Sequence, residues 1–404
     1  MVKEWNSVLI GDFLEFKNGL NKGKEFFGQG TPIVNYTDVY HKRGLYAEDI
    51  KGKVDLTRDE IKRYEVRKND VFFTRTSETP EEVGLTSVML DDIQDCVFSG
   101  FVLRGRPKNE LFDPAYCRYC FSTKPVRDAI VLGCTYTTRA LTNGKQLSLI
   151  TIPCPEIDEQ KAIASALTDI DNLIVSLEEL IEKKKNIRQG ILHDLLTGTV
   201  RISNFEKNWE EVSIDSCGHF VSGNCFPLNF QGNQTGKYPF YKVSDFNNPG
   251  NEKFMYKANN YVSADVAVHL ACNIIPANAI LFAKIGAAIF LERKKMTTTE
   301  CCIDNNMMAF LPYGNVSNRF IWLVFQNLVL GALVEATALP SLSAKSIGEV
   351  VVRIPTEIEE QEAIARVVLD MDSEIKLIND KLEKYKQIKQ GMMSELLTGR
   401  IRLV

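Results

Sequence analysis

This sequence of 404 residues lacks the features that mark several large classes of protein. No apolar run is long enough to span a bilayer, and the N-terminal stretch MVKEWNSV has no signal-peptide core. We therefore expect a cytoplasmic protein. A chain of this length is expected to form two to three domains, each able to bury its own core.

Histidine is scarce, and the cysteines do not follow a metal-binding pattern. The chain has four histidines and ten cysteines. Cys117 and Cys120 have the spacing of half a zinc site, but the sequence offers no second such pair. Cysteines in a cytoplasmic protein are usually small buried hydrophobic residues rather than disulfides. We therefore expect core packing here, and no metal.

An excess of positive charge is also missing. The 48 basic residues are outnumbered by 52 acidic ones, which gives a net charge of −4. This balance argues against a protein that coats nucleic acid regardless of sequence, because such binding relies on cations that neutralise phosphates. Specific DNA binding by a local basic surface stays compatible with it, and acidic surface elsewhere can serve partners.

The sequence shows no catalytic motif that withstands inspection. Phe26–Gly30 (FFGQG) resembles the cofactor loop of amino-methyltransferases, but no Asn/Asp-Pro-Pro-Tyr/Phe follows it, so a turn explains these glycines better. Gly232–Lys237 (GNQTGK) lacks the spacing and the final Ser or Thr of a P-loop. Zinc-hydrolase, Gly-x-Ser-x-Gly and nuclease signatures are missing as well. We expect a chain without catalytic residues and without a cofactor of its own.

What the sequence does contain is a long internal repeat. Residues 156–202 align with residues 357–403 at a constant shift. Both copies have Glu-Gln near the start, and both end in a similar phrase, QGILHDLLTG at Gln189–Gly198 and QGMMSELLTG at Gln390–Gly399. A repeat of this length governs the whole fold, so it is the first feature to interpret.

The segments that precede the two copies agree only faintly. Trp5 corresponds to Trp209, and DVFFTR (Asp70–Arg75) corresponds to AILFAK (Ala279–Lys284). The alternative explanation is an old duplication with uneven drift. That alternative predicts a loss of sequence similarity along the whole of both halves, and not only in the heads. We therefore predict a shared scaffold with two divergent heads. The predicted segments are two recognition heads, residues 1–155 and 203–356, and two constant helical spacers, residues 156–202 and 357–404.

Each constant segment predicts one long helix. Apolar residues recur at alternating steps of four and three, from Ile163 to Ile181 and from Ile364 to Tyr385. This is the seam of a left-handed coiled coil. Prolines precede each helix, acidic residues begin it, and a Thr-Gly pair ends it. About 38 residues per helix correspond to a length of about 57 Å.

We expect the two helices to pack on each other in antiparallel orientation. The direct repeat would then become a pseudo-two-fold axis, with one head at each end of a rod. The alternative is that each helix packs only on its own head, but a helix of about 57 Å would project beyond a head of that size. The predicted fold class is α+β, with two α/β heads separated by two long antiparallel coiled-coil helices.

Each head is predicted to be α+β. Short β-type runs alternate with turn residues, and a helical stretch follows them in each head, at residues 113–131 and 317–336. The expected strands lie within residues 31–39, 70–76 and 96–105 of the first head, and 238–246, 279–292 and 306–312 of the second.

Polar and basic residues gather at the ends of these expected strands, at matching places in both heads. Arg and Lys neutralise phosphates, Ser and Thr add short donors, and Arg or Asn can read base edges. Taken singly, each is better explained as a solvated surface residue; only their recurrence at matching places in both heads makes DNA binding an equally good explanation. The candidate DNA-binding residues are Lys42, Arg43, Thr74, Arg75, Arg139, Asn143, Lys145, Lys242, Ser244, Lys284, Arg293, Lys294, Ser343 and Lys345.

The repeated helix entries carry a family resemblance that covers the full chain. Glu159-Gln160 and Glu360-Gln361, each followed by Ile-Ala, together with the Leu-Leu-Thr-Gly exits, resemble the specificity subunit of type I restriction-modification enzymes. The resemblance implies two target-recognition domains that each read one half of a bipartite, asymmetric DNA sequence. It also implies that the helices set the spacing and bind two modification subunits, which methylate adenine, and that restriction subunits join this core.

On this resemblance, S-adenosylmethionine, ATP and Mg²⁺ belong to partner subunits, and this chain holds none of them. The same kind of subunit also serves assemblies that only methylate. Two alternatives stay open: a coiled-coil adaptor with two protein-binding heads, and a methyltransferase or nuclease with unrecognised motifs. The expected partner-binding residues are Glu159, Gln160, Lys183, Gln189, Leu195, Glu360, Gln361, Lys384, Gln390 and Leu396.

Overall fold

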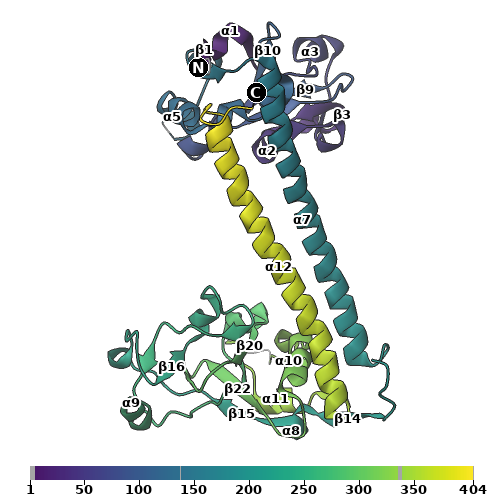
Figure 1. Cartoon of the computed structure of the whole chain (residues 1–404), viewed down its shortest axis with the longest axis vertical. Helices are drawn as coiled ribbons and strands as arrows, with labels where there is room; N and C mark the ends of the chain where they lie inside the picture. Colours follow the sequence, from purple (N-terminus) through teal and green to yellow (C-terminus); the bar gives the residue numbers. More distant parts are fainter. Residues whose placement is uncertain (1–4, 137, 335–338, 404) are drawn as a thin grey trace. The chain divides into compact units, whose positions relative to one another are not determined.

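The computed structural model describes residues 5–136, 138–334 and 339–403. The chain forms two compact units: unit 1 is Met1–Glu179 with Asn379–Val404, and unit 2 is Leu180–Ile378. Each unit thus contains one head, the first part of one long helix and the last part of the other (Figure 1). The units therefore cut across the four predicted segments.

The two long helices, α7 (Ile157–Thr197) and α12 (Ile358–Leu396), coincide with the two copies of the repeat. Ile157 and Ile358 are equivalent positions, and each helix has two acidic residues in its first turn, where the helix dipole favours negative charge. Beyond the ends lie Gly198 and Gly399, both with a φ of +71°, a conformation that suits glycine. The predicted helices and their stop signals are confirmed.

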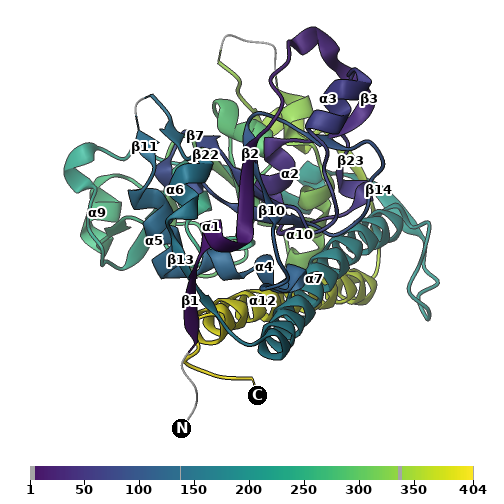
Figure 2. The same ribbon diagram turned by 90° about the horizontal axis from the view of Figure 1, so that it is seen from above.

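The helices run antiparallel within each unit, as ion pairs between them show. In unit 1, Asp171 pairs with Lys389, and Glu178 pairs with Lys386 at 3.0 Å. The residue number therefore rises along α7 while it falls along α12. Figures 1 and 2 show the segments of the two helices that belong to unit 1 alongside each other.

Unit 2 repeats this arrangement with its own ion pairs. Lys184 pairs with Glu374 at 2.7 Å, and Arg188 donates from Nε and Nη2 to both oxygens of Asp372, at 3.0 and 3.1 Å. The predicted antiparallel packing is thus confirmed inside each unit, and the alternative that each helix contacts only its own head is wrong. A pseudo-two-fold axis between the units stays a prediction.

The predicted apolar seam is the buried face of both helices. Every seam residue of the first copy is buried, whereas the second copy contains both buried and half-buried seam residues. The buried residues are Ile163, Leu167, Ile170, Ile174, Leu177 and Ile181 in α7, and Ile364, Val368 and Leu382 in α12; Met371, Ile375, Ile378 and Tyr385 are half-buried.

Both heads are built on a five-stranded sheet with the same topology. The strand order is β2-β10-β6-β8-β4 in unit 1 and β15-β22-β19-β20-β17 in unit 2, antiparallel except for the last pair, which is parallel in each. The divergent heads therefore share one fold. The bounds are β2 Leu14–Asn18, β10 Val102–Pro107, β6 Val71–Thr74, β8 Thr86–Met89, β4 Gly44–Leu45, β15 Gly218–Ser222, β22 Met307–Pro312, β19 Ile280–Ala283, β20 Lys294–Thr297 and β17 Phe254–Met255.

Smaller sheets complete each head. A two-stranded sheet, β1–β13 or β14–β23, joins the first strand of the head to the strand that precedes its long helix. Three-stranded sheets β11-β12-β7, β5-β3-β9 and β18-β16-β21 lie beside the main ones. The bounds are β1 Asn6–Leu9, β13 Thr151–Cys154, β14 Trp209–Ser213, β23 Val351–Pro355, β11 Thr135–Tyr136, β12 Ala140–Leu141, β7 Thr76–Ser77, β5 Lys53–Val54, β3 Phe27–Val34, β9 Val97–Phe98, β18 Tyr261–Val262, β16 Tyr238–Tyr241 and β21 Cys302–Ile303.

Short helices connect the strands, and Figure 2 shows the first of them, α1, between β1 and β2. The α-helices are α1 Ile10–Phe13, α2 Tyr36–His41, α3 Arg58–Arg63, α4 Pro114–Cys117, α5 Lys124–Leu132, α6 Gly144–Ser148, α8 Ile214–Cys217, α9 Ala264–His269, α10 Asn318–Asn327 and α11 Ala344–Gly348. The 3-10 turns are η1 Lys24–Phe26, η2 Ala47–Asp49, η3 Pro80–Glu82, η4 Cys120–Ser122, η5 Leu228–Phe230, η6 Val243–Asn247, η7 Ala287–Leu291 and η8 Leu330–Leu333.

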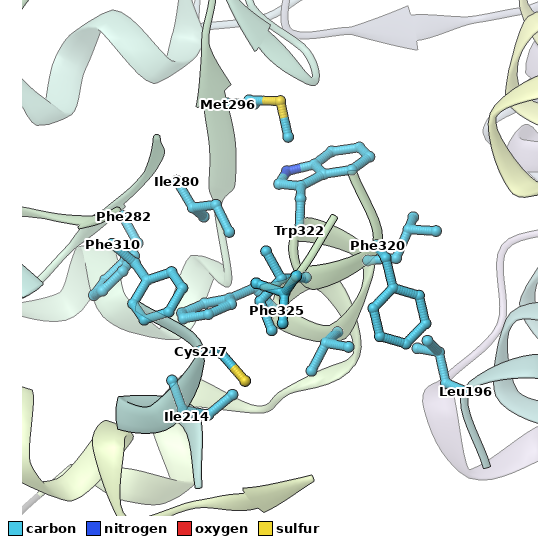
Figure 3. Packing of buried hydrophobic residues seen from close by; sticks show 14 of the residues in the cluster. Leu196, Ile214, Cys217, Ile280, Phe282, Met296, Phe310, Phe320, Trp322 and Phe325 are labelled. Atoms are coloured by element: carbon cyan, nitrogen blue, oxygen red, sulfur yellow. The ribbon is translucent and has the colours of Figure 1, made fainter. Parts of the chain in front are cut away.

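The repeated Leu-Leu-Thr-Gly phrase belongs to the cores of the heads. In unit 2, α10 supplies Phe320, Trp322 and Phe325 to the core, and Leu196 from the end of α7 points toward Phe320 (Figure 3). Leu396 and Leu397 occupy the corresponding core of unit 1. Each copy thus ends by anchoring its helix in a head, which explains why the phrase occurs twice.

Some local predictions are wrong. The stretch 317–336 is not one helix, because α10 ends at Asn327 and a 3-10 turn follows; residues 335 and 336 of this prediction lie outside the described residues. The strand expected over 279–292 ends at Ala283, since Gly286, with a φ of +79°, turns the chain into η7. The helix expected over 113–131 is interrupted before α5, whose first turn contains Pro125.

The minor motifs have structural explanations. Cys117 and Cys120 are buried in the core of unit 1, and all ten cysteines are free thiols. Gly28 and Gly30 have positive φ values of +113° and +92° where β3 departs from regular pairing. Among the described residues, none group as three or more metal-ligating side chains, and no helix is long and apolar enough to cross a membrane.

Candidate nucleic-acid interface

A buried carboxylate at the start of α7 ties together three parts of unit 1. Glu159 accepts a hydrogen bond from the indole Nε1 of Trp5 at 3.0 Å and two from the guanidinium of Arg402, both at 2.6 Å. The hydrogen bonds from Arg402 hold the pKa of the Glu159 carboxyl below its usual value. Glu159 therefore fastens the strand that enters the head and the tail that follows α12 onto the same helix end.

Unit 2 contains the same junction. Glu360 accepts from Nε1 of Trp209 at 3.3 Å and from Nε and Nη2 of Arg201 at 3.0 and 2.7 Å. The hydrogen bond to Glu360 raises the pKa of the Arg201 guanidinium. Since the glutamate and the arginine of both junctions are equivalent in the repeat, the recurrence of the Glu in the Glu-Gln motif has a structural explanation.

The glutamine of the motif binds the segment that leads into a helix of the head, α4 in unit 1 and α10 in unit 2. In unit 1, Gln160 accepts from the backbone N–H of Asp113 at 2.8 Å and donates to the carbonyls of Leu111 and Pro155, at 3.0 and 2.9 Å. In unit 2, Gln361 accepts from the N–H of Ser317 and donates to the carbonyl of Pro355, both at 2.8 Å.

These contacts correct part of the predicted partner-binding set. A buried side chain whose polar atoms are already paired has no surface to offer a partner, so we remove the four motif residues and the two core leucines. Buried are Glu159, Gln160, Leu195, Glu360, Gln361 and Leu396; exposed are Lys183, Gln189, Lys384 and Gln390. The exposed four keep their predicted role as candidates.

In unit 1, the predicted basic edge lies where β6 ends. The backbone N–H of Arg75 donates to the carbonyl of Phe101 at 2.9 Å, and its own carbonyl accepts from Thr142 at 3.0 Å. The guanidinium donates from Nη1 to the carbonyl of Gly100 at 3.2 Å. An arginine has five N–H donors, and this half-exposed one makes no other side-chain hydrogen bond among the described residues. It therefore has donors left for a phosphate or a base.

Unit 2 has the equivalent edge where β19 ends. The N–H of Lys284 donates to the carbonyl of Asn306 at 2.9 Å, and the carbonyl of Lys284 accepts from Leu342 at 2.9 Å. Its ammonium group donates to Oγ of Ser222 at 3.2 Å. The backbone contacts match those of Arg75, so the predicted equivalence of Arg75 and Lys284 is confirmed, although the two side chains differ.

A loop and a short helix lie next to this edge in each unit. Asn143 caps α6 by accepting from the N–H of Gln146 at 3.0 Å, and Ser343 caps α11 by accepting from the N–H of Ser346 at 2.9 Å. In each helix an exposed lysine follows two residues after the cap, Lys145 and Lys345. Because Thr142 and Leu342 bond to Arg75 and Lys284, the structure brings these predicted residues together in both heads.

Two predicted residues are buried, and we correct them. Thr74 has no exposed surface; its hydroxyl donates to the carbonyl of Glu82 at 2.7 Å and accepts from the N–H of Leu85 at 2.9 Å. Lys294 pairs with Glu292 and donates to the carbonyl of Leu328, each at 2.5 Å, and burial lowers the pKa of its ammonium group. Both side chains stabilise the heads.

Three of the remaining candidates are partly engaged in contacts within their heads. Lys42 pairs with Asp49, Arg43 donates to Oγ of Ser122 at 2.6 Å, and Lys242 donates to Gln231 at 3.0 Å. Burial lowers the pKa of Arg43, which also lies over the ring of Tyr119. Arg139 and Ser244 are exposed, and Arg293 is half-exposed.

Reasoning from sequence missed two kinds of residue and assigned the wrong role to a third. Arg201 and Arg402 are equivalent in the repeat, so their recurrence after the Leu-Leu-Thr-Gly phrases could have marked them. The Glu-Gln motif repeats for structural reasons, which repetition alone does not reveal. Phe101, an exposed ring beside Arg75, carried no sequence signal, because a lone phenylalanine between strands usually belongs to the core.

Comparison with known proteins agrees with this architecture. The family described as "Type I restriction modification DNA specificity domain" matches residues 2–189 and 206–387. The type I restriction enzyme MjaVIII specificity subunit of Methanocaldococcus jannaschii is 23% identical over 439 aligned residues, which cover 99% of this chain and 94% of that protein.

Solved structures show the same fold at low identity. The type I restriction-modification S subunit from M. genitalium is 17% identical with a TM-score of 0.56, covering 97% of this chain and 96% of that one. A chain from a structural description of complex assembly in the type I R-M system is 12% identical with a TM-score of 0.59, covering 98% of each.

Proposed function

This chain belongs to the family of type I restriction modification DNA specificity domains, and we propose that its two heads read the two halves of one bipartite, asymmetric DNA sequence. Recognition of a DNA target is its function, and the chain is a specificity subunit that works with other subunits. One observation carries the proposal. Both heads have the same sheet and the same basic edge, but the side chains at that edge differ.

The difference at the edge is what an asymmetric target requires. Arg75 presents a planar guanidinium that can bind a guanine bidentately, whereas Lys284 presents a compact ammonium group. We call Arg75 and Lys284 the readers of their heads. Two heads with the same fold but different readers recognise two different half-sites, whereas a palindromic target would need the same reader in both heads. The exposed Lys145 and Lys345 add positive charge for phosphates near each reader.

We further propose that the two helices set the spacing of the half-sites and bind two methyltransferase subunits. Exposed apolar residues recur at equivalent positions of the repeat: Ile187 is 43% exposed and Ile388 is 39% exposed. Two equivalent apolar positions suit two copies of one partner. S-adenosylmethionine, ATP and Mg²⁺ would then belong to the methyltransferase and restriction subunits, and this chain would be inert alone.

The test replaces each reader separately in the assembled complex. Arg75→Ala should change recognition of one half-site and Lys284→Ala that of the other. A lost base contact should cost about 1–3 kcal/mol and relax one position, whereas a lost phosphate contact should weaken all sequences and reduce the salt slope by about one. Methylome sequencing and DNA binding at several salt concentrations separate these cases.

The matched control is Lys124→Ala, which removes an exposed charge from α5 of unit 1. It should leave both half-sites unchanged. If Arg75→Ala and Lys284→Ala behave like this control, the basic edges are ordinary solvated charges and the readers lie elsewhere.

A further inference from the structure

Phe101 is an exposed aromatic residue at the edge that carries Arg75. It lies in the turn between β9 and β10, and the residue is 58% exposed. Single exposed hydrophobic residues are common and need no explanation on their own. This one is distinguished by its position, because the N–H of Arg75 donates to the carbonyl of Phe101 and the guanidinium donates to the carbonyl of the preceding Gly100. The Arg75 guanidinium is thus held by the same turn that carries the Phe101 ring.

Backbone hydrogen bonds fix the conformation of this turn. The N–H of Gly100 donates to the carbonyl of Leu20 at 2.7 Å, and the N–H of Val102 donates to the carbonyl of Ser99 at 3.1 Å. A Cβ atom at Gly100 would lie 2.0 Å from Oδ1 of Asn21 and 3.1 Å from the carbonyl oxygen of Leu20, so a larger residue there would require the Asn21 side chain to move. A ring with two rotatable bonds on a fixed backbone loses little conformational entropy when it binds.

The chemistry of the ring points to one feature of DNA. Phosphates and sugars offer it little apolar surface, and most base edges are polar. The exception in the major groove is the 5-methyl group of thymine, which apolar side chains including phenylalanine contact. An arginine beside it contributes donors for a neighbouring base edge.

Resting on the proposed function, we propose that Phe101 is a specificity-determining residue of the first head: its ring contacts the 5-methyl group of a thymine next to the base or phosphate bound by Arg75. The second head has a polar residue at the same place. Asn306 provides the carbonyl that accepts from Lys284, and its side-chain amide donates to Asp304 at 3.1 Å. The two heads therefore differ at this position in polarity as well as in charge.

The experiment uses the chain assembled with its methyltransferase subunit. Methylome sequencing first gives the target, and a panel of duplexes then replaces each thymine of the half-site read by the first head with deoxyuridine, which removes only the methyl group. Since burying one methyl group is worth about 0.8 kcal/mol, one substitution should weaken binding by the wild-type complex roughly fourfold. Phe101→Ala should bind more weakly and should no longer distinguish thymine from deoxyuridine at that position.

Controls and outcomes separate this inference from the function it rests on. Leu149→Ala removes another exposed apolar side chain from the same head and should keep the methyl preference. If the complex shows no sequence preference at all, the proposed function fails. If it recognises its target but no deoxyuridine in that half-site matters, or if Phe101→Ala weakens all sequences alike, as a wedge between bases would, the function stands and the thymine contact is wrong. The deoxyuridine panel needs only the wild-type protein, so the test does not depend on the variant folding.

Discussion

At the scale of single residues, burial separates the functional candidates from the structural ones. Thr74 and Arg75 are neighbours, but Thr74 is the last residue of β6, which is buried along its whole length, whereas Arg75 follows the strand and is half-exposed. Sequence could locate the strand end and the charge, since both follow from composition and pattern. It could not decide which side chain turns inward, because that depends on the pairing of β6 with distant strands.

Glu159 permits a stability prediction at this scale. Glu159→Ala should destabilise unit 1 by roughly 3 kcal/mol, because it leaves Arg402 and the Trp5 indole without their buried partner. Chemical unfolding of the complete chain, followed by the fluorescence of its tryptophans, measures this. The matched control is Glu178→Ala, whose ion pair with Lys386 is exposed and should be worth less than about 1 kcal/mol. Equal losses in both variants would show that the junction adds nothing special.

The same carboxyl gives a pH dependence. The pKa of Glu159 is lowered in the folded chain, so its contribution is fully present above the unfolded value of about 4.3 and is lost as the pH falls through the folded value. The stability difference between the wild type and Glu159→Gln should therefore be constant near neutral pH and shrink in acid. Urea unfolding at a series of pH values measures it, and a difference that grows in acid would contradict the assignment.

At the scale of elements, the long helices could be predicted and the sheets could not. The apolar steps of four and three lie within one continuous segment, and the repeat shows them twice, so α7 and α12 follow from local pattern. The five-stranded sheets depend on pairings between distant segments, such as Leu103 with Asn18, and on strands as short as two residues. A two-residue strand leaves no periodicity to read in the sequence.

The helix surface makes a prediction about assembly. Ile187→Asp and Ile388→Asp should each remove one of two methyltransferase subunits, and the double variant should remove both, because a charge in an apolar contact is left desolvated. The matched control is Leu377→Asp, which is 69% exposed but corresponds to Ser176 in the other copy, so a repeated interface does not use it. Native mass spectrometry of the reconstituted complex counts the subunits. Full occupancy in the double variant would move the interface elsewhere on the chain.

At the scale of the whole molecule, one chain combines a repeated frame with two unlike readers. The frame consists of the two long helices, each of which contributes to both units, and of a Glu-Trp-Arg junction and a sheet topology that occur once in each unit. The readers occupy the same edge of both sheets but carry different side chains, Arg75 with Phe101 in one head and Lys284 with Asn306 in the other. A frame that repeats while its readers vary should tolerate exchange of a complete head.

Exchange of the first head tests this separation of frame and reader. The replaced segment should be residues 5–155, because β1 pairs with β13 and a cut between them would leave each strand without its partner. The incoming head should carry a tryptophan at the position of Trp5, since Glu159 of the frame binds that indole. Methylome sequencing should then show one new half-site, while the half-site read by the second head keeps its bases. A hybrid that alters both half-sites would show that the heads depend on each other, and that specificity is not built from two independent readers.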